Sequence, residues 1–265
     1  MNEKNWWQRM FDQKYLDTYL GSLTPERTKE EVDFIVKAAQ LRQSEKILDL
    51  ACGHGRHAIE LAERGFTHIT GLDYSEVFID KAVQDSAQAG VNVRFLRGDM
   101  KELSFDNEFD KVLLLFTSFG YFDDETNVGV FRQINKSLKL HGKFFIDVVS
   151  GEAVKRRFEH EGVFDPETNL YKIPRQVEMS GHLTDEIEWY DSKKQIIHSH
   201  REWTDNDKKK EYDYYLHVYT MSQYEQMLTD TGFVIDETWG DTKGNSFNVA
   251  GPSTRTIILA KKISS

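Results

Sequence analysis

Three aspartates stand at or near the ends of successive apolar runs of the chain. Asp49 lies within KILDLAC, Asp73 follows the apolar part of HITGLDYS, and Asp99 follows VRFLRG. Two glycines, Gly53 and Gly55, separate the first two runs and allow a ligand to approach the backbone closely. Because carboxylates accept hydrogen bonds, Asp73 is placed to bind both hydroxyls of a ribose and Asp99 the exocyclic amine of an adenine. The spacing therefore predicts a nucleoside site.

Asp49 indicates what else the nucleoside carries. Gly53, Gly55 and Ala58 also fit the fingerprint of dinucleotide-binding proteins, which would favour a nicotinamide or flavin cofactor. A carboxylate four residues before the first glycine would repel a pyrophosphate, but it would attract an ammonium or a sulfonium. We therefore predict that the cofactor is S-adenosyl-L-methionine, which is converted to S-adenosyl-L-homocysteine.

The runs that carry these residues alternate with amphipathic stretches, as in β-α-β units. Five apolar runs between residues 46 and 150 include KVLLLFTS and KFFIDVVS, and helical periodicity separates most of them. This alternation predicts an α/β fold with a Rossmann-like, doubly wound and mostly parallel sheet. Two helices are expected before it, in residues 6–40, where Thr24-Pro25 is typical of a helix N-terminus.

Residues 151–219 have a different pattern. Polar and aromatic residues alternate in four segments separated by turn-like DSKK and DNDKKK, which predicts antiparallel strands. A helix over MSQYEQMLTDTGF and two strands, VIDETWG and RTIILAKK, are then expected to complete the sheet in residues 220–265. The antiparallel β insert is thus predicted before the last helix and strands.

At the glycine turn the chain resembles the class I S-adenosylmethionine-dependent methyltransferases, whose first motif reads LDLACGHGRH here and whose ribose acid matches Asp73. The resemblance covers residues 46–150. Residues 116–122, FTSFGYF, and the late insert look like those of small-molecule N-methyltransferases acting on glycine or amino sugars, which often have histidine where this chain has Tyr121. The Asn/Asp-Pro-Pro-aromatic tetrapeptide of DNA and protein-glutamine methyltransferases is absent after this strand. The resemblance implies methyl transfer to a nitrogen or oxygen of a small-molecule acceptor.

Tyr15 and Tyr19 resemble the aromatic residues with which related enzymes close a lid over the cofactor, although core packing of an amphipathic helix explains them as well. Met100 is expected to pack on the adenine ring, and Phe116 to line the cofactor or belong to the core. The predicted cofactor-binding residues are Tyr15, Asp49, Ala51, Gly53, Gly55, Asp73, Tyr74, Asp99, Met100 and Phe116.

Other residues are candidates for handling the acceptor. Tyr121 could orient an amine or hydroxyl through its phenol, or form an aromatic wall. Asp147, at the end of the fifth predicted strand, would suit an amine acceptor or a structural hydrogen bond, and His57 could approach the acceptor, approach the methionine carboxylate or cap a helix. Arg255 could hold an acceptor carboxylate or form a surface ion pair. We predict catalytic roles for Tyr121, Asp147 and His57, and acceptor binding for Tyr19, Ser118 and Arg255.

Composition limits the partners. Forty-four acidic against 34 basic side chains give a formal charge of -10, which disfavours nucleic acid. Cys52 is the single cysteine, so no internal disulfide can form, and cysteine usage suits the cytoplasm. No apolar run approaches the length of a membrane span. No metal is predicted, because His198 and His200 alone do not make a site.

The sequence leaves several assignments open. We expect residues 1–45 to form a helical lid, 46–150 and 220–265 the cofactor-binding core, and 151–219 a lobe that covers the acceptor or joins a homodimer. A tRNA or protein methyltransferase that docks its substrate on the insert is an alternative. A non-catalytic subunit that binds S-adenosylmethionine is another, since Tyr121 replaces the expected histidine.

Overall fold

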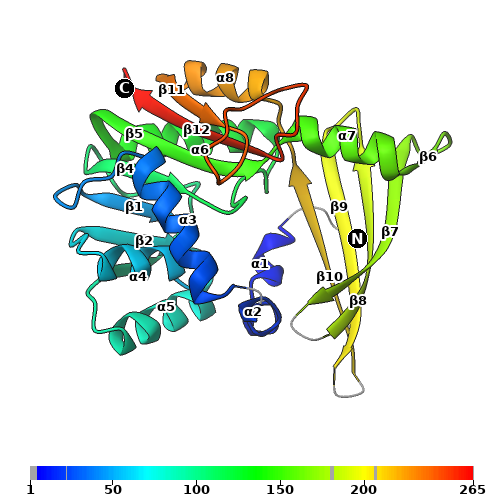
Figure 1. Ribbon diagram of the computed structural model, residues 1–265, viewed down its shortest axis with the longest axis horizontal. Coiled ribbons are helices and arrows are strands. Elements are labelled where there is room, and N and C mark those ends of the chain that lie inside the picture. Colours follow the sequence, from blue (N-terminus) through cyan, green and yellow to red (C-terminus); the bar gives the residue numbers. More distant parts are fainter. Residues whose placement is uncertain (1–4, 22, 180–181, 206–207, 265) are drawn as a thin grey trace.

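The protein is represented by a computed structural model whose described part comprises residues 5–21, 23–179, 182–205 and 208–264; the side chains of residues 19, 179, 182, 205 and 208 lie outside it. Figure 1 shows two β-sheets, with the first two helices of the chain between them. One sheet carries the glycine turn, and the other is built by the insert.

The larger sheet has seven strands in the order β11-β12-β5-β4-β1-β2-β3. The neighbours among β1 to β5 pair in parallel, and β12 runs antiparallel to both β5 and β11. The bounds are β1 (Ile47–Leu50), β2 (Ile69–Asp73), β3 (Arg94–Arg97), β4 (Phe109–Leu114), β5 (Leu138–Val149), β11 (Phe233–Trp239) and β12 (Arg255–Lys262). The predicted fold class, a Rossmann-like and mostly parallel sheet, is confirmed.

Helices cover both faces of this sheet. Ile47 and Leu48 are neighbours in β1, and because side chains alternate along a strand they belong to different apolar clusters. Ile47 packs in the cluster of α3 and α4, and Leu48 in that of α6 and α8. The covering helices are α3 (Pro25–Ala38), α4 (Arg56–Glu63), α5 (Glu76–Gln88), α6 (Asp124–Ser137) and α8 (Met221–Asp230). Because helices cover both faces, β1 and β2 are buried at every position.

The N-terminal part begins with two short helices, α1 (Trp7–Met10) and α2 (Gln13–Leu20). With α3 they make three helices in the described residues where the sequence predicted two. The predicted start of α3 is present, since the Thr24 hydroxyl accepts a hydrogen bond from the Arg27 amide and Pro25 is the first helical residue. α1 contacts the insert and α2 contacts α5, so the segment bridges both bodies.

The second sheet has five antiparallel strands in the order β10-β9-β8-β7-β6. Their bounds are β6 (Val163–Asp165), β7 (Leu170–Met179), β8 (His182–Asp191), β9 (Ile196–Asp205) and β10 (Lys208–His217). The four predicted strands correspond to β7 through β10. The sequence missed β6 and the helix α7 (Gly151–Glu161), which begins at the N-cap Ser150.

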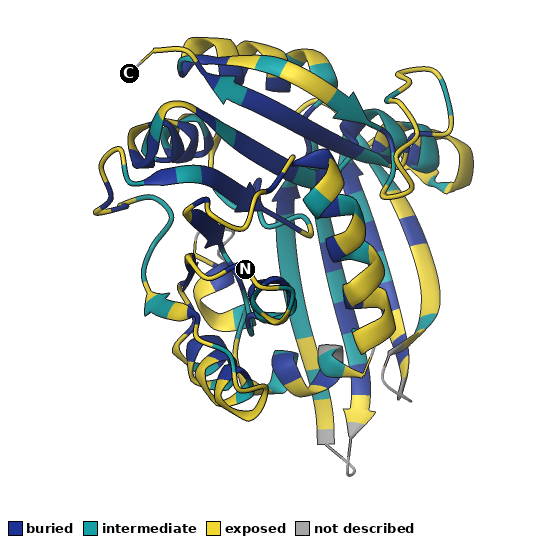
Figure 2. Cartoon of the chain, turned by 60° about the vertical axis from the view of Figure 1, so that its left-hand side comes forward, coloured by how far each residue is buried: buried dark blue, intermediate teal, exposed yellow. Residues whose placement is uncertain are grey.

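Figure 2 separates the two sheets by burial: strands of the larger sheet are largely buried, whereas those of the second alternate between buried and exposed residues. One face of the second sheet is therefore covered and the other faces water. Among the helices described, none combines the length and apolar character that crossing a membrane requires.

Candidate active site

The turn after β1 is held in a left-handed conformation. Ala51, Gly53 and Gly55 have φ angles of 54°, 58° and 79°. A Cβ atom at Gly55 would lie 2.6 Å from Cζ of Phe95, so this position has no room for a side chain. Gly55 packs against Phe95 and is outside the lining of the cavity described below, which differs from its predicted cofactor contact. We assign it to the shape of the turn.

Asp73 ties the end of β2 to this turn. Its Oδ2 accepts a hydrogen bond from the Gly53 amide and its Oδ1 one from the Ser75 amide, both at 2.8 Å. Burial raises the pKa of Asp73, and these amides oppose the rise. Each carboxylate oxygen has a second lone pair, so the group can still accept a hydroxyl.

A cavity, here the first cavity, opens at the carboxyl ends of β1, β2 and β4. Nine of the ten predicted cofactor-binding residues line it, Gly55 being the exception, and so do Ser118, His57 and Tyr121. Trp7 and Phe11 cover it from the N-terminal segment, and the Ser75 hydroxyl donates to the Phe11 carbonyl at 2.6 Å. The side chain of Tyr19 lies outside the described part of the structure.

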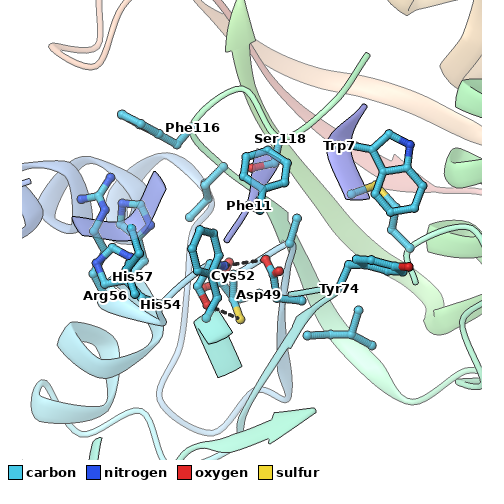
Figure 3. A pocket seen from close by; sticks show the side chains of 18 of the residues that line it. Trp7, Phe11, Asp49, Cys52, His54, Arg56, His57, Tyr74, Phe116 and Ser118 are labelled. Atoms are coloured by element: carbon cyan, nitrogen blue, oxygen red, sulfur yellow. Dashed lines mark hydrogen bonds between the residues drawn. The ribbon is translucent and has the colours of Figure 1, made fainter. Parts of the chain in front are cut away.

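The two ends of the first cavity differ in chemistry. Figure 3 shows His54, Arg56 and His57 gathered at one end and Trp7 and Tyr74 at the other. Trp7 meets Tyr74 edge to face with ring centroids 4.6 Å apart. One end is thus cationic and polar, and the other aromatic.

Asp99 and Met100 complete the lining of the first cavity. Asp99 Oδ1 accepts from the Lys101 amide at 2.9 Å, and Lys101 Nζ lies 3.4 Å from Oδ2. The carboxylate is thereby fixed in orientation while a quarter of the side chain remains accessible.

Two oppositely charged groups in the first cavity have an unsatisfied buried atom. Asp49 Oδ2 and Arg56 Nη2 are buried and have no hydrogen-bond partner among the described residues. Burial raises the pKa of Asp49 to about 7, although the charge of Arg56 opposes the rise. Buried polar atoms are normally paired, so this pair fits a ligand that brings both an ammonium and a carboxylate. The amino-acid end of S-adenosylmethionine has both.

His57 and Arg56 are linked through Glu31. Glu31 of α3 contacts His57 Nε2 at 2.9 Å and Arg56 Nη1 at 2.5 Å. Burial lowers the pKa of His57 to about 4, so the ring is neutral at pH 7 and donates its Nε2 proton to Glu31. Burial opposes the ionisation of Glu31, but the hydrogen bond from His57 and the charge of Arg56 hold its pKa at about 2. The predicted catalytic role of His57 stays a prediction, and its contact with Glu31 also suits a role in positioning Arg56. Glu31 itself was not predicted from the sequence.

Asp147 and Arg255 bind each other. Arg255 Nε donates to Asp147 Oδ1 at 2.7 Å, and the Phe116 amide also donates to this carboxylate. Burial raises the pKa of Asp147, against the effect of Arg255. Phe116 and Thr117 have φ angles of 56° and 62°, a conformation that costs free energy outside glycine. The pair holds this strained loop, and the predicted acceptor roles of Asp147 and Arg255 stay predictions.

Tyr121 stands where the same loop meets the insert. A Cβ at Gly120 would lie 2.2 Å from the His217 carbonyl oxygen, and the His217 amide donates to the Gly120 carbonyl at 2.8 Å. Glycine thus permits the end of β10 to dock on this loop. The Tyr121 hydroxyl donates to the Thr117 carbonyl at 3.2 Å, and the ring meets Trp6 edge to face.

A second cavity, of ≈ 620 Å³, lies between the loop and the covered face of the insert. It shares four wall residues with the first cavity: Phe11, Tyr15, Phe116 and Tyr121. Most of its remaining lining is apolar or aromatic, and its charged lining residues are Arg157, Arg175, Glu188 and Arg255. The sequence did not predict Arg175 and Glu188, because the inward face of β7 and β8 is known only once the strand register is known. It did not predict Arg157 because it missed the helix α7.

His198 and His200 share the side of β9 that faces water. In the described residues the ligand atoms of His200, Glu202 and Glu211 lie within 4.8 Å of one another. Lys209 Nζ already contacts Glu202 Oε1 at 2.7 Å, and Asp213 contacts His200 Nδ1 at 3.1 Å. We assign no metal to these paired groups.

Comparisons with known proteins agree with this geometry. The family described as "Methyltransferase domain" matches residues 47–142. The chain is 29% identical over 210 residues to a putative methyltransferase, YqeM, of Bacillus subtilis, a match that covers 77% of this chain and 79% of that protein.

Two solved structures share the fold. The CcbJ methyltransferase from Streptomyces caelestis superposes with a TM-score of 0.79 at 18% identity and 100% coverage of both chains. The amino pentose methyltransferase CalS10 from Micromonospora echinaspora, solved with S-adenosylmethionine bound, gives 0.61 at 19% identity, covering 95% of this chain and 97% of the other.

Proposed function

We propose that this chain is a class I S-adenosylmethionine-dependent methyltransferase that methylates a nitrogen or oxygen of a small-molecule acceptor. In this proposal the first cavity binds the cofactor and the second binds the acceptor. It is in line with CalS10, an amino pentose methyltransferase of the same fold.

We propose that the first cavity binds S-adenosylmethionine. Asp49 would bind the ammonium and Arg56 the carboxylate, which pairs the unsatisfied atoms of both side chains. Asp73 would accept the ribose hydroxyls and Asp99 the adenine amine, at the end where Trp7 encloses the ring. The cofactor supplies an electrophilic methyl group on a sulfonium.

The shared wall of the two cavities carries the proposal of a small acceptor. Both cavities are lined by Phe11, Tyr15, Phe116 and Tyr121, so the two cavities adjoin at these residues. An acceptor in the second cavity would meet the methyl group at this junction. The second cavity is bordered by the N-terminal segment, α7 and the insert. A cavity of this size, bordered by three segments of the chain, suits a metabolite better than a folded RNA or protein.

The chain's chemical task is then mainly positioning. The acceptor's lone pair must lie in line with the methyl group, so that the new bond to carbon forms as the carbon–sulfur bond breaks and its electron pair stays on sulfur. We propose that the oxygen of Tyr121 accepts a hydrogen bond from the acceptor's N–H or O–H and thereby orients that lone pair. The aromatic wall excludes water, and the acceptor releases its proton after transfer.

We further propose roles for the surrounding segments. Residues 1–45 would act as the lid of the first cavity, since Trp7, Phe11 and Tyr15 line it. Residues 151–219 would cover the acceptor, because α7, β7 and β8 supply side chains to the second cavity.

The test is formation of S-adenosylhomocysteine by purified protein supplied with S-adenosylmethionine and a library of small metabolites. Product that depends on one added compound, and saturates with its concentration, would support the proposal. Product formed only with tRNA or protein as the added component would refute it.

A further inference from the structure

Two carboxylates on β8 differ in how fully they are paired. Glu186 and Glu188 lie two residues apart, so both side chains point to the covered side of the second sheet. Both oxygens of Glu186 have partners, since Oε1 accepts from the Ser199 hydroxyl at 2.7 Å and Oε2 from Arg175 Nε at 2.8 Å. The Glu186 side chain is 0% exposed and lies outside the lining of the second cavity. Its contacts are therefore internal to the sheet.

Glu188 is paired through one oxygen. Arg157 Nη2 of α7 donates to Glu188 Oε2 at 2.8 Å, and Arg175 Nη2 lies 3.2 Å from the same oxygen. Among the residues that the structure describes, none pairs with Oε1 of Glu188. The side chain is 4% exposed and lines the second cavity. Because a carboxylate buried to this degree normally has both oxygens paired, Oε1 is available to a ligand in the cavity.

The two arginines keep hydrogen-bond donors for the same ligand. In the described part of the chain, the Nη1 groups of Arg157 and Arg175 have no partner. Contacts of their other nitrogens with carboxylates hold both guanidiniums in place. Both arginines line the second cavity, and both contact Glu188. The cavity thus presents one open acceptor atom with two open donors close to it.

This arrangement selects against a charged ligand group. An anion bound to Arg157 and Arg175 would lie beside the carboxylate of Glu188 and be repelled, and an ammonium bound to Glu188 would lie beside two guanidiniums. A hydroxyl satisfies both partners through one atom, because its O–H donates while its lone pairs accept. It also brings one donor to the one open oxygen, whereas a primary amide brings two.

Glu188 lies away from the junction of the two cavities. The junction is formed by Phe11, Tyr15, Phe116 and Tyr121. Glu188 lines the second cavity and is outside the lining of the first. A group bound to Glu188 is therefore separate from the atom that receives the methyl group.

We propose that the methyl acceptor carries a hydroxyl group, remote from the methylated atom, which donates to Glu188 Oε1 and accepts from Arg157 or Arg175. This inference rests on the proposed function. Glu188 then determines specificity, because an acceptor that lacks the hydroxyl leaves a buried carboxylate oxygen without a partner.

The first experiment measures by calorimetry the binding of matched probes to the protein saturated with S-adenosylhomocysteine. The probes are 4-aminobenzyl alcohol, 2-(4-aminophenyl)ethanol and trans-4-aminocyclohexanol, each beside its methyl ether and its deoxy form. We expect at least one alcohol to bind, and its ether and deoxy form to bind at least about tenfold more weakly, because a hydrogen bond to a charged group is lost. If no alcohol binds, if none is preferred to its deoxy form, or if 4-aminobenzoate binds more tightly than 4-aminobenzyl alcohol, the proposal is wrong.

The second experiment changes the carboxylate. In Glu188→Gln the two arginines would hold the amide oxygen and leave its NH₂ group, which cannot accept, facing the cavity. The preference for the alcohol over its deoxy form should fall to about twofold or less, while the deoxy form binds as before. Equal weakening of both compounds would show that Glu188 only supports the arginines, and an undiminished preference would remove it from the site.

Glu159→Gln is the matched control, because Glu159 of α7 is 47% exposed and contacts Lys155 at 3.8 Å. It should leave the preference unchanged. Folding is checked by circular dichroism. Should Glu188→Gln fail to fold, Glu188→Asp replaces it, since it keeps the charge but withdraws the oxygen from the cavity, and the same loss of preference is expected.

The same titrations separate this inference from the proposed function. If neither S-adenosylmethionine nor S-adenosylhomocysteine binds, the proposed function fails. If both bind and the protein methylates only acceptors that have no second polar group, or a charged one, the proposed function stands and the hydroxyl is wrong.

Discussion

The two cavities that meet at Phe116 and Tyr121 are built in different ways. The side of the first that the glycine turn forms is shaped by backbone, because the turn and the amides bound to Asp73 lie between β1 and the start of α5. The second is shaped by side chains from α1, α7, the insert and β12, which are far apart in sequence.

This contrast indicates which substitutions each cavity can tolerate. A backbone turn with no room for a Cβ tolerates little change, which suits a cofactor that is the same throughout a family. A wall of side chains on a docked sheet can be altered one residue at a time, which suits an acceptor that differs from enzyme to enzyme. Substitutions in the first cavity should therefore affect cofactor binding, and those in the second should affect acceptor binding and turnover.

The strongest test of the contrast is Gly55→Ala. The new Cβ would lie 2.6 Å from Phe95 in a left-handed backbone conformation, so the turn must shift. We expect the free energy of unfolding to fall by about 2 to 4 kcal/mol and cofactor affinity to fall by at least about 100-fold. Thermal melting and calorimetry measure both.

Gly129→Ala is the matched control. It lies within α6, where an added Cβ meets nothing within 4 Å, so it should leave affinity unchanged and not lower stability. Normal cofactor affinity in Gly55→Ala would show that the turn is not rigid.

Asp73→Ala should have the next largest effect. The substitution removes an acceptor proposed for the ribose and also releases the Gly53 amide. We expect cofactor binding to weaken by about 2 kcal/mol, or roughly 30-fold, with Asp73→Asn intermediate. Calorimetry that finds unchanged affinity would remove Asp73 from the site.

The pH dependence of cofactor binding tests Asp49. The pKa of Asp49 in the folded protein, about 7, is above the ordinary value for aspartate. Its ionisation therefore lowers the free energy of unfolding as the pH rises from that ordinary value to about 7. An ammonium needs the ionised form, and we therefore expect the Kd of S-adenosylmethionine to rise about tenfold from about pH 7.5 to about pH 6.

Asp49→Asn should bind the cofactor more weakly, lose this pH dependence and melt higher than the parent protein at neutral pH, because it buries no charge. A pH dependence that persists in Asp49→Asn would assign it to another group.

Tyr121→Phe should have the smallest effect, and only on turnover. Loss of one oriented hydroxyl should lower kcat about fivefold while the Kd of the cofactor stays constant. Tyr121→Ala removes the shared wall and should raise the KM of the acceptor instead. Unchanged turnover in Tyr121→Phe would mean that the ring is a wall and nothing more.

The sequence was informative where structure is local. Asp49, Asp73 and Asp99 could be placed at one edge because the carboxyl ends of parallel strands meet there, and nearly all of the predicted cofactor-binding residues line one cavity. Gly55 was assigned to the cofactor because a fingerprint does not say which glycine faces the ligand and which faces Phe95.

It was uninformative where strand register or docking decides. Asp147 and Arg255 pair across β5 and β12, and Glu31 reaches His57 from a different helix, contacts that span many residues of sequence. From the sequence alone, the charged residues of β7 and β8 could face either water or the covered side of the sheet. The strand register places Arg175 and Glu186 on the covered side. The helix α7 was missed because its sequence, GEAVKRRFEHE, is mostly charged and has few apolar positions.

The central claim is that the first cavity binds S-adenosylmethionine through the charges of its amino-acid end. Calorimetry at neutral pH tests it most directly, with S-adenosylmethionine, S-adenosylhomocysteine and NADH titrated into the same preparation. We predict Kd values in the micromolar range for the first two, stabilisation against unfolding by about 2 to 4 kcal/mol at saturation, and no binding of NADH. Binding of NADH in place of S-adenosylmethionine would contradict the account.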